Sequence, residues 1–125
     1  MLQSRVDHYL QTVGGTQVSA NKIDLNGTGE LVLAAPGLVT PAATCYYGDM
    51  CVWSGQNFSG DFLSKYICSR FSIPWVSTGS WRNNQTSGTQ ARFYDANGKL
   101  YYTTPGAPVY DTSYYWAPIY SIVPC

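Results

Sequence analysis

The chain has 125 residues, a length typical of one domain with one hydrophobic core. Its seven basic and seven acidic side chains cancel, which excludes the clustered cationic face of a nucleic-acid-binding domain and a polybasic membrane anchor. Charged residues make up 11% of the chain and aromatic residues 15%, including 11 tyrosines, so the composition favours a turn-rich β-protein over a helical bundle.

The N-terminal segment, residues 1–13, carries apolar residues at the spacing of a short amphipathic helix. These residues are Leu2, Val6, Tyr9, Leu10 and Val13. Gly14 and Gly15 follow, as expected at the C-terminal end of a helix. A flexible arm that becomes ordered only on docking is compatible with the same residues, so both alternatives stay open.

A β-hairpin is predicted next, because Thr16–Leu25 and Glu30–Ala35 flank an Asn26-Gly27 turn. Proline and glycine residues between positions 36 and 41 then indicate a linker. We therefore expect residues 1–41 to form an extension of a main domain, residues 42–125, with both parts in one folding unit.

Short aromatic strands separated by turns are predicted after residue 45. The candidate strands are Met50–Trp53, Asp61–Tyr66, Ser80–Asn83, Gln90–Tyr94, Lys99–Thr103 and Tyr114–Ile122. Strands at this spacing indicate an all-β sandwich or barrel with Greek-key connections.

Four cysteines, an even number in a small chain, predict two disulfides and an oxidising compartment. Three pairings are open at this point. A zinc site is the weaker alternative, because there is no C-x-x-C and the single histidine, His8, is distant in sequence. The start of the chain has no apolar run of signal-peptide length, and the Leu31–Ala35 stretch is too short to span a bilayer. We expect a secreted protein whose signal peptide is absent from this sequence, with no membrane insertion.

Catalysis is not expected. His8 lies in the N-terminal segment, where a histidine is more often a solvated helix residue than a catalyst. The scattered acids Asp49, Asp61, Asp95 and Asp111 fall in predicted turns, where Asp is common. No phosphate-binding glycine motif is present.

The segment Trp53-x4-Phe58-x-Gly60 resembles the βγ-crystallin Greek-key signature. In that resemblance the first aromatic residue packs over a folded hairpin and the glycine adopts a conformation that a Cβ would disfavour. Tyr94-Asp-Ala-Asn-Gly98 looks like a shorter second copy of the motif. The resemblance implies a Greek-key sandwich.

The spacing Cys45-x5-Cys51, just before that motif, is similar to the opening of the secreted, mostly actinobacterial, peptidase inhibitor family I36. Trp81 and a final cysteine follow the order of that family. This resemblance implies the pairings Cys45–Cys51 and Cys68–Cys125. The second short disulfide-tied loop that carries inhibition in the family's metalloproteinase inhibitors has no counterpart after Cys68.

Calcium is not expected, and no other cofactor is implied. The calcium-binding relatives carry leading oxygen ligands at two places where this chain has Trp75–Ser80 and Tyr115–Tyr120, and both segments lack them.

The leading functional hypothesis is a secreted protein-binding module that resembles a protease inhibitor and occupies the cleft of a secreted peptidase. Alternatives are a non-inhibitory adaptor in a secreted, toxin-like complex and a glycan-binding module. Adjacent aromatic residues on a strand point to opposite faces, so one ring of each pair can be core while the other must be exposed or covered by a partner. The pairs are Tyr46-Tyr47, Tyr101-Tyr102 and Tyr114-Tyr115, the last followed by Trp116. Core packing and β-propensity explain these rings as well as a contact surface does. The candidate contact residues are Val52, Trp53, Tyr46, Tyr102, Tyr115, Trp116, Tyr9 and Leu10.

Overall fold

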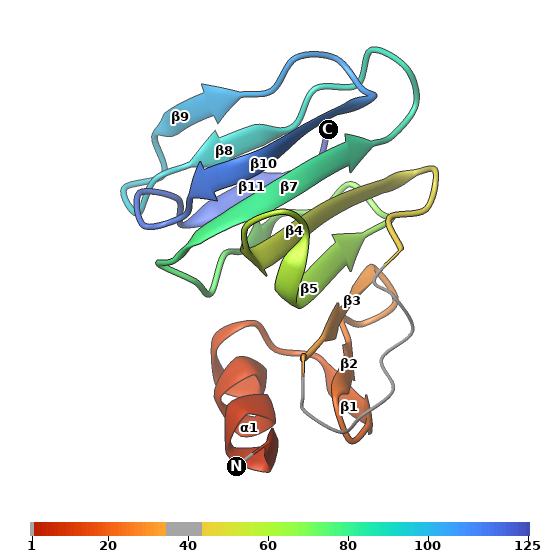
Figure 1. Cartoon of the computed structure of the whole chain (residues 1–125), viewed down its shortest axis with the longest axis vertical. Coiled ribbons are helices and arrows are strands. Elements are labelled where there is room, and N and C mark those ends of the chain that lie inside the picture. The colour runs from red at the N-terminus through yellow and green to blue at the C-terminus, as the bar shows by residue number, and fades with distance from the viewer. Residues whose placement is uncertain (1, 35–43) are drawn as a thin grey trace.

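The computed structural model describes residues 2–34 and 44–125, and it confirms the predicted all-β class (Figure 1). One short helix, α1 (Leu2–Thr12), precedes the strands. The strands of the described residues are β1 (Thr16–Ser19), β2 (Lys22–Asp24), β3 (Gly29–Val32), β4 (Asp49–Gly55), β5 (Ser59–Lys65), β6 (Phe71–Ser72), β7 (Thr78–Asn84), β8 (Arg92–Tyr94), β9 (Leu100–Thr103), β10 (Val109–Tyr115) and β11 (Ser121–Val123).

The strands form two antiparallel sheets with the orders β1-β2-β3-β5-β4-β7-β10 and β6-β11-β8-β9. The two halves of the main domain follow one plan. In the first half β4, β5 and β7 pair in the larger sheet while β6 joins the smaller one, and in the second half β8, β9 and β11 pair in the smaller sheet while β10 joins the larger one. Each sheet thus contains a strand from the other half, so the halves cannot separate without breaking both sheets.

The N-terminal extension continues the larger sheet, because β3 pairs with β5 from Gly29↔Lys65 to Val32↔Phe62. The Asn26-Gly27 turn is present, with φ of 56° and 76° at its two residues. The expectation of a single strand over Thr16–Leu25 is wrong: a turn divides it into β1 and β2. Asn21 stabilises that turn by bonding Leu33 through both its side chain and its backbone oxygen.

The end of the chain also differs from expectation, since Tyr114–Ile122 is not one strand. After β10 the chain turns at Trp116, whose carbonyl accepts the Ile119 N–H at 2.8 Å, and β11 begins at Ser121. Pro118 within this segment cannot donate to a ladder, which explains the break. The sequence patterns also missed β6, which has two residues, and most of β10, whose alternation of half-buried and exposed residues is interrupted by an irregularity between Asp111 and Tyr114 and includes no fully buried residue.

The hydrophobic core combines side chains of the helix, the extension and both sheets. Its largest fully buried members include Trp81, Trp116, Phe93, Ile23, Leu31, Met50, Leu63 and Ile122. Helix α1 buries Val6 and Tyr9 against this core. The N-terminal segment is therefore a docked helix, and the alternative of a flexible arm does not describe residues 2–12.

Two disulfides join Cys45 to Cys51 and Cys68 to Cys125, which is the pairing implied by the family resemblance. Their Cα–Cα distances, 6.0 and 5.7 Å, lie within the ordinary range for disulfides. Two structural disulfides in a small domain indicate an oxidising or extracellular environment. Among the described residues, α1 is too short and polar to cross a membrane.

The motif Trp53-x4-Phe58-x-Gly60 occupies a folded hairpin between β4 and β5. The Trp53 ring lies 4.9 Å from the Phe58 ring, and Gly60 adopts φ of +83°. A Cβ at Gly60 would lie 2.3 Å from Ser54 Oγ, so this position requires glycine. In the second half, Gly98 has φ of +76° in the turn after Tyr94.

Candidate functional site

Four of the candidate contact residues are buried and cannot touch a partner in this conformation. Val52 and Trp116 lie in the core between the sheets, and Tyr9 faces the sheet from α1. Trp53 is covered on the opposite face of the larger sheet, where it packs with Phe62. The prediction that these four residues contact a partner is wrong, because their apolar surface is already buried by packing within the protein.

The other four candidates divide by exposure. Tyr102 and Leu10 are half-buried and pack against the core. Tyr46 and Tyr115 are 69% and 60% exposed, respectively. They lie on different elements, since Tyr46 precedes β4 and Tyr115 ends β10. Tyr46 is the better-supported contact residue, because its surroundings are rigid.

The Cys45–Cys51 loop comprises the seven residues closed by the first disulfide. Its Asp49 N–H donates to the Tyr46 carbonyl at 3.0 Å, which closes a tight turn. Two bonds to Asn84 at the end of β7 attach the loop to the sheet: the Gly48 N–H donates to the Asn84 carbonyl at 2.7 Å, and the Asn84 side chain donates to the Cys45 carbonyl at 3.0 Å. The loop is therefore fixed at both ends and at its middle.

Tyr46 and Tyr47 project from this loop, at 69% and 74% exposed. The expectation that these two rings lie on opposite faces of a strand is wrong, because the two residues precede β4 and lie in a turn. Gly48 follows with φ of +100° and open space where a Cβ would stand. Its role is conformational: it allows the turn that displays both rings.

Further exposed side chains lie at the same end of the larger sheet. Tyr66 and Ile67 follow β5 directly after Lys65, which pairs with Met50 of the loop. The Asp49 carboxyl at the base of the loop is buried, and this burial raises its pKa. The large exposed side chains at this end of the sheet are aromatic or aliphatic, as is common at protein-binding surfaces.

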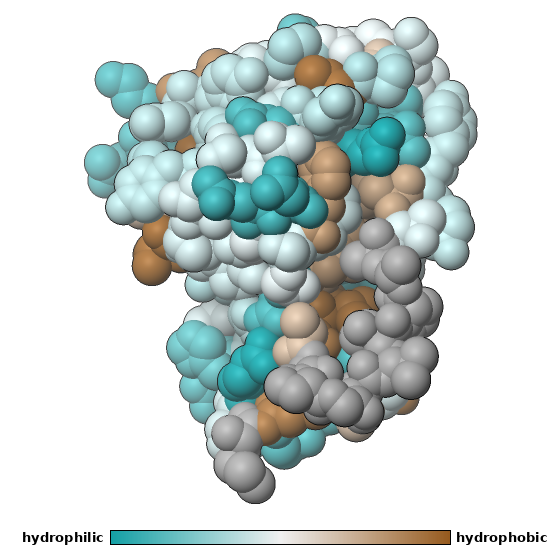
Figure 2. All heavy atoms as spheres, viewed as in Figure 1, coloured by the Kyte–Doolittle hydropathy of each residue, from teal (hydrophilic) through white to brown (hydrophobic). Residues whose placement is uncertain are grey.

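On the face drawn in Figure 2, strongly hydrophobic side chains form small separate areas within a pale to hydrophilic surface. The hydropathy scale ranks tyrosine as mildly hydrophilic, so exposed tyrosines do not stand out in this colouring. A contact surface made of tyrosines can therefore be present without a large strongly hydrophobic patch in this colouring.

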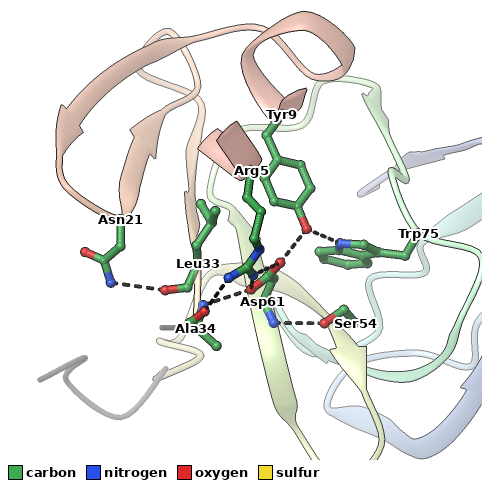
Figure 3. Close-up of polar contacts among 8 residues, drawn as sticks. All are labelled: Arg5, Tyr9, Asn21, Leu33, Ala34, Ser54, Asp61 and Trp75. Atoms are coloured by element: carbon green, nitrogen blue, oxygen red, sulfur yellow. Dashed lines mark hydrogen bonds and ion pairs between the residues drawn. The ribbon is translucent and has the colours of Figure 1, made fainter. Parts of the chain in front are cut away.

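Sequence reasoning missed Asp61, which it placed in a turn as an ordinary polar residue. The residue is buried near the start of β5, where its carboxylate accepts bonds from the Arg5 guanidinium, the Tyr9 hydroxyl and the Ala34 N–H (Figure 3). The Trp75 indole donates to the Tyr9 hydroxyl at 2.8 Å. Every partner holds the helix or the extension in place, which makes this a structural cluster. Only the fold reveals it, because its members are far apart in sequence.

Residues 2–34 and 44–125 contain no group of three His, Cys, Asp or Glu side chains close enough together to hold a metal ion. His8 lies on the exposed face of α1.

Comparison of the chain with protein-family models, with curated proteins and with solved structures found no significant match.

Proposed function

We propose that the protein is a secreted, disulfide-stabilised protein-binding module whose contact is the Cys45–Cys51 loop. The observation that carries this proposal is the display of two adjacent, largely exposed tyrosines, Tyr46 and Tyr47, on a loop closed by a disulfide. Tyrosine offers a large contact area at a small cost in side-chain entropy. A loop that is already rigid loses little further freedom on binding.

The family resemblance suggests a secreted peptidase as the partner, and the loop geometry supports a steric mode of inhibition. The turn from Tyr46 to Asp49 is tight, so it cannot lie in a cleft as an extended strand in the way a substrate peptide does. It would instead block the cleft entrance with two aromatic side chains. A tightly turned backbone tied by a disulfide is a poor substrate, which accounts for binding without cleavage.

The test is to titrate thermolysin-like, subtilisin-like and trypsin-like secreted peptidases with the disulfide-bonded protein. We expect inhibition at micromolar concentration in one class, and a loss of at least about tenfold in affinity for a Tyr46→Ser/Tyr47→Ser variant. Tyr101→Ser is the matched control, because Tyr101 is an exposed tyrosine on β9, away from the loop. The inhibitor proposal fails if no peptidase is inhibited at micromolar excess.

An adaptor in a secreted complex is the second candidate, favoured by exposed tyrosines outside the loop. Tyr101, Tyr110, Tyr115 and Tyr120 are all more than half exposed. A free N-terminal arm is no longer among the contacts available to such an adaptor, because α1 is docked against the core. Recovery of a stoichiometric partner from culture supernatant that is not an active peptidase would support the adaptor over the inhibitor.

A further inference from the structure

Lys65, at the end of β5, is a lysine buried in the protein interior. It is 4% exposed. Its ammonium nitrogen donates to Thr28 Oγ1 at 2.7 Å and to Ser69 Oγ at 2.8 Å. The Phe71 ring centroid lies 5.7 Å away. The ammonium has three protons, and these two hydroxyls account for two of them.

No carboxylate compensates this charge in the described part of the chain, whose two ion pairs are Arg5–Asp61 and Lys22–Glu30. The residues outside it, 1 and 35–43, include no Asp or Glu. Burial lowers the pKa of Lys65, as expected for an ammonium group that has lost water without gaining an anion. Buried charges in proteins are normally paired with an opposite charge, and the Lys65 ammonium has no such partner.

A cavity of about 130 Å³ adjoins Lys65. Its other lining residues are Val13, Leu25, Asn26, Thr28, Phe71 and Ser72. It lies between the N-terminal extension and β6, and it combines a polar wall with an apolar one. Since a water molecule takes up about 30 Å³, the space suits a ligand of only a few heavy atoms.

We propose that this cavity binds a small monocarboxylate, of the size of formate to propionate, with its carboxylate against Lys65 Nζ and its hydrocarbon part against Val13, Leu25 and Phe71. One ammonium group matches one negative charge. A phosphate or sulfate dianion would need a second cation, and the cavity lining provides none. The site is separate from the Cys45–Cys51 loop and does not depend on the function proposed for it.

The experiment is thermal unfolding of the disulfide-bonded protein with sodium formate, acetate or propionate, against sodium chloride at equal ionic strength. We expect a rise in Tm of about 4 °C at ten times the dissociation constant, increasing with the logarithm of concentration beyond it, and none with chloride. Lys65→Met, which keeps a long unbranched side chain and removes the charge, should abolish the rise in Tm. Lys99→Met is the control, because Lys99 is exposed in the turn before β9.

A carboxylate response equal to that of chloride overturns the proposal, as does an equal response in Lys65→Met. If Lys65→Met does not fold, NMR of the wild-type protein with ¹³C-labelled acetate tests the proposal instead. Saturable magnetisation transfer from the acetate methyl group to the Phe71 ring supports the site. Its absence, or equal displacement of acetate by phosphate, overturns it.

Discussion

Arg5 on α1 and Asp61 on β5 form a two-pronged ion pair, in which Arg5 Nη2 lies 2.7 and 2.9 Å from the two carboxylate oxygens. The Tyr9 hydroxyl, one helical turn further on, donates to the same carboxylate. The Ala34 N–H, at the end of the extension, donates to it at 2.8 Å. One buried acid therefore joins the helix, the extension and the main sheet, and it explains why the N-terminal segment is part of the folding unit.

Replacing Asp61 by Asn should lower the free energy of unfolding by about 3 kcal/mol, because it removes the charge that Arg5 and Tyr9 share. The loss is set at the low end of the range for buried pairs because the Arg5 side chain is 45% exposed. Urea denaturation measures it. Glu30→Gln is the control, since the Lys22–Glu30 pair lies at the surface and should cost less than about 1 kcal/mol. Equal losses in the two variants would contradict a special role for Asp61.

The stability of the protein should fall at alkaline pH because of two tyrosines. Burial, and for Tyr9 also the bond to Asp61, raises the pKa of Tyr9 and Tyr114. In the unfolded chain both hydroxyls ionise near pH 10, while in the folded protein they keep their protons to higher pH. The folded state then binds more protons, so the stabilisation is complete below about pH 10 and is lost as pH rises above it.

Urea midpoints between pH 9 and pH 12 check this dependence. Each buried tyrosine should contribute a loss of up to about 1.4 kcal/mol per pH unit. Tyr9→Phe and Tyr114→Phe should each flatten the slope, and Tyr47→Phe, an exposed position away from both hydroxyls, is the control. An unchanged slope in both buried-site variants would show that other groups cause any alkaline unfolding.

The sequence predicted those parts of the fold that depend on local patterns. Short aromatic segments between turn residues located β4, β5 and β7, and Asn26-Gly27 located a hairpin turn, because these signals lie within a few residues of each other. The exchange of β6 and β10 between the sheets could not be predicted, since it depends on how two distant halves of the chain pack.

The candidate site was predicted only in part, for the same reason. The resemblance pointed to the Cys45–Cys51 loop, but strand alternation assigned Tyr46 and Tyr47 to opposite environments when both are exposed. Trp53 and Trp116 were predicted to be contact residues because tryptophan is common at interfaces, but both are buried by packing within the protein. Asp61 and Lys65 carry no local sequence signal, because their partners come from other elements.

Removing the disulfides should destabilise the protein unequally. The Cys68–Cys125 bond has a sequence separation of 57 residues and the Cys45–Cys51 bond one of 6. In the chain-entropy description, the longer loop contributes about 4 kcal/mol and the shorter one about 2 kcal/mol. Paired Cys→Ser variants, compared by urea denaturation, check this order. A larger loss from the Cys45/Cys51 variant would show that the loop stabilises the sheet beyond its entropy.

Gly48→Ala should loosen the Cys45–Cys51 loop without touching its tyrosines. Gly48 has φ of +100°, which strains any residue with a Cβ, although the space around it is open. The expected cost is about 1 kcal/mol. Hydrogen exchange at the Gly48 amide, which bonds the Asn84 carbonyl, should become about fivefold faster as the turn opens more often. Gly48→Asn is the matched control, because asparagine tolerates positive φ better than alanine and should lose less. If alanine and asparagine give the same stability and exchange rate as glycine, the turn does not depend on this backbone conformation and the loop is not held as rigidly as its hydrogen bonds indicate.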